Sequence, residues 1–219
     1  HNLTQQGVEQ TVLVVGYRAD DIKYIAGNSV ASMRLTYVEN PRFAETNTAY
    51  SLWVAREFLR GSCLVLEGDI VFEEAVLERL LRLEGESAWA GVSVAPGRDE
   101  GILLEADSSG RVLACQLVRR SVERAPCLLY KCAGIQKLSP GLVHTLVIGL
   151  EEAVRSDKLR VYADLVLGQF LHMTDMRLCL LDDLKWAEID HFEDLHYART
   201  LFDESSTDAI MAPPEGQKR

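Results

Sequence analysis

Two short acidic segments contain the residues whose types and spacing could do chemistry. Glu67-Gly68-Asp69 follows an apolar run, and Glu188-Ile189-Asp190 comes near the C-terminal end of the chain. If both segments meet in one crevice, Asp69 and Asp190 can bind a single Mg²⁺, which typically takes one or two carboxylates together with substrate phosphates. The alternative for Asp69 is that its carboxylate caps the helix that follows it.

A third segment is rich in small polar residues and precedes a helical pattern. Thr46 to Ser51, TNTAYS, comes directly before Leu52 to Leu59, where apolar residues recur at helical spacing. Small polar residues at a helix start offer backbone N–H groups, amides and hydroxyls to a ligand. Ordinary N-capping explains the same residues, so both interpretations stay open.

Other candidate groups give weaker signals. Tyr130, Tyr162 and Trp186 could line a pocket for a cationic ligand by cation–π contact, although such aromatic residues more often belong to a core or its rim. The five histidines do not form a site by spacing, and no serine or cysteine lies in a recognisable nucleophile elbow.

The elements that must position these residues follow from the apolar patterns. The run after Ser62 is typical of a strand covered on both faces, which delivers Asp69 to the carboxyl end where α/β sheets bind ligands. A helix is expected next, with Phe72, Val76, Leu77, Leu80 and Leu81 on one side. Gln10 to Tyr17 predicts a second buried strand, parallel to the first. Further strands are expected at Arg34–Val38, Ala88–Val94, Ile102–Ala106, Arg111–Val118 and Leu128–Ile135, and further helices from Ala19, Leu142 and Asp164 and over Phe192–Phe202.

The alternation of strands and helices predicts one α/β domain. We expect a mostly parallel sheet flanked by helices over residues 1–202. Residues 203–219 are polar and contain prolines, which favours a disordered tail.

Composition excludes several classes of partner. The formal net charge is −10 over 219 residues, so nucleic acid and anionic membranes are not expected partners. The five cysteines are an odd number without a CxxC pair, which indicates buried thiols in a reducing compartment. No apolar stretch approaches the roughly 20 residues that span a bilayer, and no signal peptide opens the chain, so a cytoplasmic location is expected.

The order of the segments resembles the sugar-phosphate nucleotidylyltransferase superfamily, and within it the phosphocholine and inositol-phosphate cytidylyltransferases. The resemblance runs from about Gly7 to Phe202, and ETN..YSL and EID..EDL are its most specific parts. It is carried by VVGY, NPRFAETNTAYSLWVAREFL, LVLEGDIVF, AGIQKLS and WAEIDHFEDLHYA. It implies a GT-A type, Rossmann-like fold and transfer of a nucleotidyl group from a nucleoside triphosphate, with CTP expected. The acceptor would be a phosphate or phosphonate monoester, and pyrophosphate would be released.

The resemblance also implies roles for individual residues. Asp69 and Asp190 match two Mg²⁺ ligands, and Glu188 matches an acidic residue of the acceptor site, where Tyr130 and Tyr162 are also expected. The metal would neutralise the triphosphate and align it for in-line attack, without a covalent intermediate. The nucleotide-binding residues would be Gly16, Glu45, Thr46, Asn47 and Ser51.

Three departures from the family pattern matter. The family opens with a strand and a glycine-rich loop, LAAGxGxRL followed by a lysine, and this pattern does not occur before Gly7. Since His1 to Gly7 is typical of the end of a helix, we expect an N-terminal truncation that removes the loop and a central strand. Gln116 stands where a further lysine is often found, and no tryptophan lies near Gly101 for stacking on choline. The alternatives are therefore a catalytically inactive domain that binds a ligand or partner, and a GT-A glycosyltransferase that uses a nucleotide sugar.

Overall fold

The computed structural model describes residues 1–83, 85, 87–94, 100–119 and 128–203. The α-helices are α1 (Asn2–Gln5), α2 (Ala19–Ala26), α3 (Thr48–Val54), α4 (Glu74–Arg82), α5 (Pro140–Arg155), α6 (Ala163–Gly168) and α7 (Phe192–Phe202), with 3₁₀ turns η1 (Arg56–Phe58) and η2 (Leu171–Met173). The strands are β1 (Gln10–Val15), β2 (Ser29–Val30), β3 (Met33–Glu39), β4 (Cys63–Leu66), β5 (Ile70–Phe72), β6 (Ser87–Ser93), β7 (Gly101–Ala106), β8 (Val112–Val118), β9 (Leu128–Leu138), β10 (Met176–Leu180) and β11 (Trp186–Glu188).

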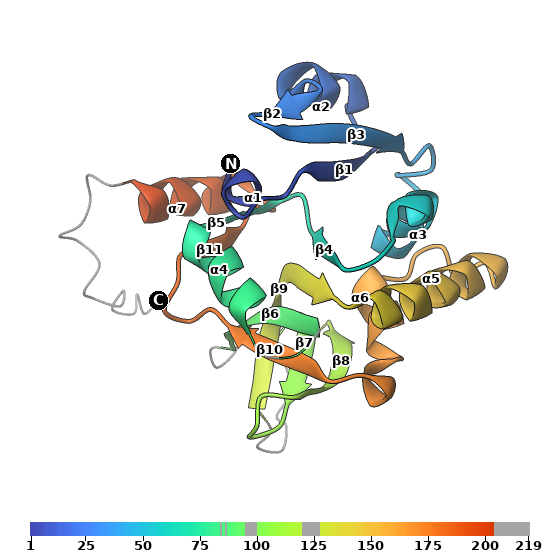
Figure 1. Ribbon diagram of the computed structural model, residues 1–219, viewed down its shortest axis with the longest axis vertical. Coiled ribbons are helices and arrows are strands. Elements are labelled where there is room, and N and C mark those ends of the chain that lie inside the picture. Colours follow the sequence, from blue (N-terminus) through green and yellow to red (C-terminus); the bar gives the residue numbers. More distant parts are fainter. Residues whose placement is uncertain (84, 86, 95–99, 120–127, 204–219) are drawn as a thin grey trace, which may run out of the picture.

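The described strands form three sheets. A large sheet has the order β10-β6-β9-β7-β8, with β4 also paired to β9. A small sheet, β1-β3-β2, lies with α2 at the top of the view in Figure 1. The third sheet contains only β11 and β5, which run antiparallel.

The predicted α/β class, with a central sheet flanked by helices, is confirmed, but the strand directions differ from expectation. Among the described pairs, only β1–β3 and β10–β6 are parallel. A short turn between β7 and β8 gives an antiparallel pair, whereas parallel neighbours need a longer crossover. The expected parallel pairing of β1 with the strand before Asp69 does not occur in the described residues, because β1 and β4 belong to different sheets.

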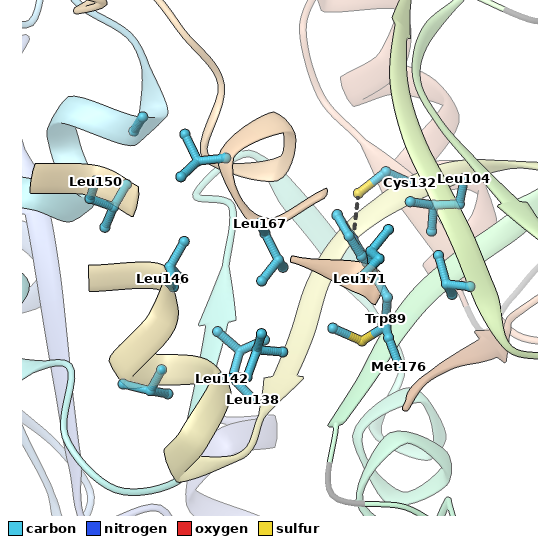
Figure 2. Close-up of a cluster of buried hydrophobic side chains, with 14 of the residues drawn as sticks. Trp89, Leu104, Cys132, Leu138, Leu142, Leu146, Leu150, Leu167, Leu171 and Met176 are labelled. Carbon is cyan, nitrogen blue, oxygen red and sulfur yellow. Dashed lines mark hydrogen bonds between the residues drawn. The ribbon is translucent and has the colours of Figure 1, made fainter. Parts of the chain in front are cut away.

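Helices cover both faces of the large sheet. Along β6, side chains alternate, so Trp89 enters one core cluster while Ala88 and Ala90 enter another. The first cluster is formed with α5 and α6, and Figure 2 shows Leu142, Leu146 and Leu150 of α5 pointing toward β9. The second cluster is formed with α4. The buried residues that α4 contributes are Val76, Leu77 and Leu80.

Most predicted elements are present, but several differ from expectation. The helix after Asp69 begins only at Glu74, because Phe72 belongs to an unexpected strand, β5. Leu81, which was expected on the apolar side of this helix, is 38% exposed. The helix expected over Asp164–His172 is divided into α6 and η2, and β10 was not expected. Strand β9 continues past Ile135 to Leu138.

Some predictions fall on residues outside the described part of the chain. These are Cys127 and all of the expected tail except Asp203. The four described cysteines are free thiols; Cys132 and Cys179 are buried, and Cys63 and Cys115 are partly buried. Within the described residues, no helix has the length and apolar character needed to cross a membrane.

Candidate functional site

The two acidic segments lie next to each other because the short strands beside them pair. Glu188 of β11 stands opposite Ile70 of β5 in an antiparallel register. The ladder continues outward, since the amide of Ile189 donates to the carbonyl of Asp69 at 2.8 Å. The structure therefore brings Asp69 and Asp190 to the same end of one ladder, which is a condition for their binding one metal ion together.

The capping alternative for Asp69 is wrong. Helix α4 has Glu73 as its N-cap residue, and β5 separates Asp69 from the helix start. The carboxylate of Asp69 is exposed and makes no hydrogen bond or ion pair with another described residue. The side chain of Asp190 is likewise exposed and unpaired in the described part of the chain.

These two carboxylates fit the ligand set of a magnesium ion better than that of a fully protein-bound metal. Among the residues that the structure describes, no group of three or more His, Cys, Asp or Glu side chains could hold a metal. Mg²⁺ commonly uses one or two carboxylates and completes its octahedron with water and substrate phosphates. Asp69 and Asp190 meet that requirement, and their metal binding stays a prediction.

Glu188 lies in a group of charged side chains that the sequence did not reveal. Its Oε2 accepts a hydrogen bond from Nζ of Lys131 at 2.6 Å, so the two form an ion pair. Burial, together with the carboxylates of Asp164, Asp69 and Glu188, raises the pKa of Glu67 to about 8, while Lys131 opposes the shift. Four carboxyl groups therefore lie near one ammonium group.

Glu67 is held against β9 at a position where only glycine fits. The amide of Glu67 donates to the carbonyl of Gly134 at 2.9 Å. Gly134 has φ +70°, and a Cβ at this residue would come within 2.7 Å of Oε2 and 3.1 Å of Cβ of Glu67. Because the left-handed conformation also disfavours larger residues, Gly134 has two reasons to be glycine.

A buried hydrogen-bonded network lies behind this charged group. Asp164 is only 3% exposed, and its Oδ1 accepts from Nε2 of Gln136 at 2.8 Å and from Sγ of Cys132 at 3.6 Å. Nε1 of Trp89 donates to the same sulfur at 3.1 Å, the contact drawn in Figure 2. Burial raises the pKa of Asp164 above its usual value. The network ties α6 to β9 and so fixes the strand that presents Lys131.

The segment expected to face the nucleotide forms the start of α3. Asn47 is its N-cap, and Oδ1 of Asn47 accepts from the amide of Thr48 at 2.7 Å. The segment is fastened to the start of α6, because Oγ1 of Thr48 accepts from the amide of Ala163 at 2.8 Å. Nε of Arg160 also donates to the carbonyl of Glu45 at 3.1 Å. N-capping is thus part of this segment's role, and nucleotide binding stays a prediction.

The remaining predicted residues have mixed surroundings. Gly16 packs so tightly that a Cβ would lie 2.5 Å from Cβ of Phe43, which gives this glycine a packing role. Tyr130 packs against the first core cluster, on the face of β9 opposite Lys131 by strand alternation. Tyr162 is the N-cap residue of α6, directly before Ala163. No contact in the described residues tests the acceptor role of either tyrosine.

Sequence reasoning gave no site role to Lys131, Asp164 or Asn40, and it named Glu67 only as part of an acidic segment. The signal for Lys131 was present, because it is the charged residue within the apolar run Leu128 to Cys132. The positions of Asp164 and Asn40, both buried polar side chains, depend on tertiary contacts that no local pattern reveals.

Known proteins are similar to this chain in sequence and in fold. No family model matches the sequence. The chain is 33% identical over 225 residues to the CMP-5'-(3-aminopropyl)phosphonate synthase of Streptomyces rubellomurinus (strain ATCC 31215); the match covers all of this chain and 34% of the relative. The chain therefore spans about a third of the length of that relative.

Solved structures share the fold at low sequence identity. The CTP:phosphocholine cytidylyltransferase of Streptococcus pneumoniae superimposes with a TM-score of 0.68 and 18% identity, over 90% of this chain and 79% of that one. The inositol-1-phosphate CTP transferase of T. maritima gives 0.69 and 16%, over 91% and 78%. The chain thus shares the fold of these two cytidylyltransferase structures, as the sequence resemblance implied, and it is similar in sequence over its whole length to the curated synthase.

Proposed function

We propose that this chain transfers a cytidylyl group from CTP to a small phosphonate or phosphate monoester and releases pyrophosphate. The observation that carries the proposal is the β5–β11 ladder, which brings Asp69 and Asp190 together beside the Glu188–Lys131 ion pair. The curated relative is named as a synthase of a CMP-phosphonate, which agrees with this reaction. That relative is about three times longer than this chain, so the reaction in its name comes to this chain only as a proposal.

The reaction needs no covalent intermediate. An oxygen of the acceptor's phosphonate attacks the α-phosphorus of CTP, a P–O bond forms there, and the bond to the pyrophosphate oxygen breaks. Asp69 and Asp190 would hold Mg²⁺, which supplies charge neutralisation for the triphosphate. Nδ2 of Asn47 and the hydroxyl of Ser51 would donate hydrogen bonds to the nucleotide, and the described residues offer neither group another acceptor.

We further propose that the acceptor carries a cationic amine. Burial and the neighbouring carboxylates of Asp164, Asp69 and Glu188 raise the pKa of Glu67. A cationic group at the expected acceptor position is therefore favoured, because it would stabilise the ionised form of Glu67. The name of the curated relative, an aminopropylphosphonate derivative, agrees with such an acceptor. Lys131 supplies the one ammonium that can interact with the acceptor's phosphonate oxygens among the residues described around this position.

The experiment is a pyrophosphate-release assay on the protein with CTP, Mg²⁺ and an aminoalkylphosphonate. The D69N and D190N substitutions should each lower kcat at least about 100-fold, since each removes a charge expected at the metal. D20N, which changes an exposed carboxylate on α2, is the matched control. CTP binding without turnover would instead favour the inactive-domain alternative, and equal activity of D69N and wild type would refute the proposal.

A further inference from the structure

Asn40 is a buried polar residue whose whole carboxamide is used to hold the predicted nucleotide segment. The residue is 3% exposed and directly follows β3. Its Nδ2 donates to Oγ1 of Thr46 at 3.0 Å and to Oγ of Ser51 at 3.1 Å. Its Oδ1 accepts from the amide of Arg42 at 2.9 Å. One side chain therefore connects the end of β3, the following turn and helix α3.

The bond from Arg42 fixes which way the carboxamide points. A backbone N–H can only donate, so the atom of Asn40 that faces it must be the oxygen. The amide nitrogen then faces the two hydroxyls and donates to both. Thr46 and Ser51 must therefore accept hydrogen bonds from Asn40.

The hydroxyl protons of Thr46 and Ser51 consequently differ in whether they have a hydrogen-bond acceptor. Oγ1 of Thr46 also lies 2.9 Å from the carbonyl of Arg42, to which it donates. Thr46 thus has both a donor and an acceptor partner within the turn. Oγ of Ser51 accepts from Asn40, and its proton has no acceptor among the residues that the structure describes.

We propose that Asn40 is a positioning residue that fixes the hydroxyl of Ser51 as a hydrogen-bond donor to an acceptor atom of the nucleotide, whereas Thr46 stabilises the turn. The inference rests on the proposed function and divides the residues expected at the nucleotide into two groups. Ser51 donates a hydrogen bond to the ligand, and Thr46 stabilises the turn that precedes helix α3, which contains Ser51. An acceptor atom of the nucleotide, such as a ring nitrogen or carbonyl oxygen, is the complementary group.

An isosteric substitution reverses this hydrogen-bond polarity. In N40D both side-chain oxygens accept, so the bond from the Arg42 amide is kept while the two donors to Thr46 and Ser51 are lost. The Ser51 proton then turns toward the introduced carboxylate and is withdrawn from the ligand. S51A removes the same donor directly, and T46V removes only the bonds within the turn.

The test measures CTP affinity by titration calorimetry, the KM for CTP and the thermal stability of each variant. N40D and S51A should each weaken CTP binding about 3- to 10-fold, the range for one hydrogen bond, with kcat changed less than about twofold. The double variant N40D/S51A should bind CTP no more weakly than the weaker single variant, because both act through one proton. T46V should lower the melting temperature and weaken CTP binding less than S51A does.

The controls separate the possible outcomes. T145V, which removes an exposed hydroxyl bonded to Gly141 within α5, should leave affinity and KM unchanged. The positioning role would be overturned if the fold-losses in CTP affinity of N40D and S51A multiply in the double variant. It would also be overturned if T46V weakens CTP binding as much as S51A does. If N40D does not fold, the CTP affinities of S51A and T46V still test the proposal, which requires the larger loss in S51A. Wild type that binds CTP without turnover would refute only the proposed function, since calorimetry still reports the positioning; wild type that binds no CTP would refute both.

Discussion

Replacing Gly134 by alanine should disturb both the stability of the chain and the position of Glu67. The new Cβ would lie 2.7 Å from Oε2 and 3.1 Å from Cβ of Glu67, where ordinary van der Waals contact begins at 3.4 Å. The carboxylate oxygen can rotate away, but the Cβ of Glu67 moves only with its backbone. That backbone is bonded to the carbonyl of Gly134 itself, so β4 and β9 must shift together.

The expected magnitude has two parts. Alanine in the left-handed conformation costs about 1–2 kcal/mol. Overpacking against Glu67 adds about 1–2 kcal/mol, at the lower end of typical values because part of the clash is with a flexible carboxylate. The sum of about 2–4 kcal/mol corresponds to a fall in melting temperature of roughly 5–15 °C for a chain of this size.

Gly110 provides a matched control. It has φ +79°, close to that of Gly134, and a Cβ there would meet no atom within 4 Å. G110A therefore reports the backbone cost alone, and the difference between the two variants in urea unfolding reports the clash with Glu67. Introducing E67A into G134A should recover part of that difference, because it removes the carboxylate and keeps the Cβ. Equal destabilisation by G134A and G110A would refute the close approach of Glu67 to β9.

Two further predictions concern other parts of the chain. G16A should destabilise the N-terminal sheet by about 1–3 kcal/mol, since its Cβ would lie 2.5 Å from Cβ of Phe43. F43A should relieve only part of this cost in calorimetric unfolding of the double variant, because it removes the ring of Phe43 and keeps its Cβ. The hydrogen bonds from Arg79 lower the pKa of Asp183 to about 2, so this pair stabilises the fold above the unfolded-state pKa and the contribution is lost as pH falls toward 2. Unfolding of D183N should accordingly depend less steeply on pH between about 4 and 2 than wild type; identical pH profiles would contradict the pairing.

Elements with a long, regular apolar pattern could be predicted from sequence, whereas short ones could not. The run at Cys63–Leu66 and the helical spacing of Val76, Leu77 and Leu80 appear in the structure as β4 and α4. Strand β5 was missed because its three apolar residues, Ile70–Phe72, are too few to distinguish a strand from a helix turn. The error mattered, because the capping interpretation of Asp69 depended on a helix that begins directly after it.

Only some residues of the candidate site could be predicted from the sequence, for a related reason. Carboxylates after strands give a local signal, so Asp69, Glu188 and Asp190 could be identified from sequence. Lys131 and Asn40 acquire their roles from residues elsewhere in the chain, and the Lys131–Glu188 pair joins residues 57 positions apart. A charged residue inside an apolar strand can be noticed in advance, but its partner is set by how the sheets pack.

The position of the acidic segments depends on an unusually small piece of structure. Strands β5 and β11 contribute three residue pairs and belong to no larger sheet among the described strands, and an isolated two-stranded ladder is marginally stable in water. Contacts to neighbouring elements must therefore hold it. Nε1 of Trp186 donates to the carbonyl of Ala133 in β9 at 2.9 Å, and Oε1 of Glu73 accepts from the amide of Lys185 at 2.8 Å. Trp186, for which the sequence left a ligand pocket and a core or rim position open, thus fastens the ladder to the strand that also carries Lys131. The proposed metal-binding and acceptor-binding ends of the site are therefore held together by one set of contacts.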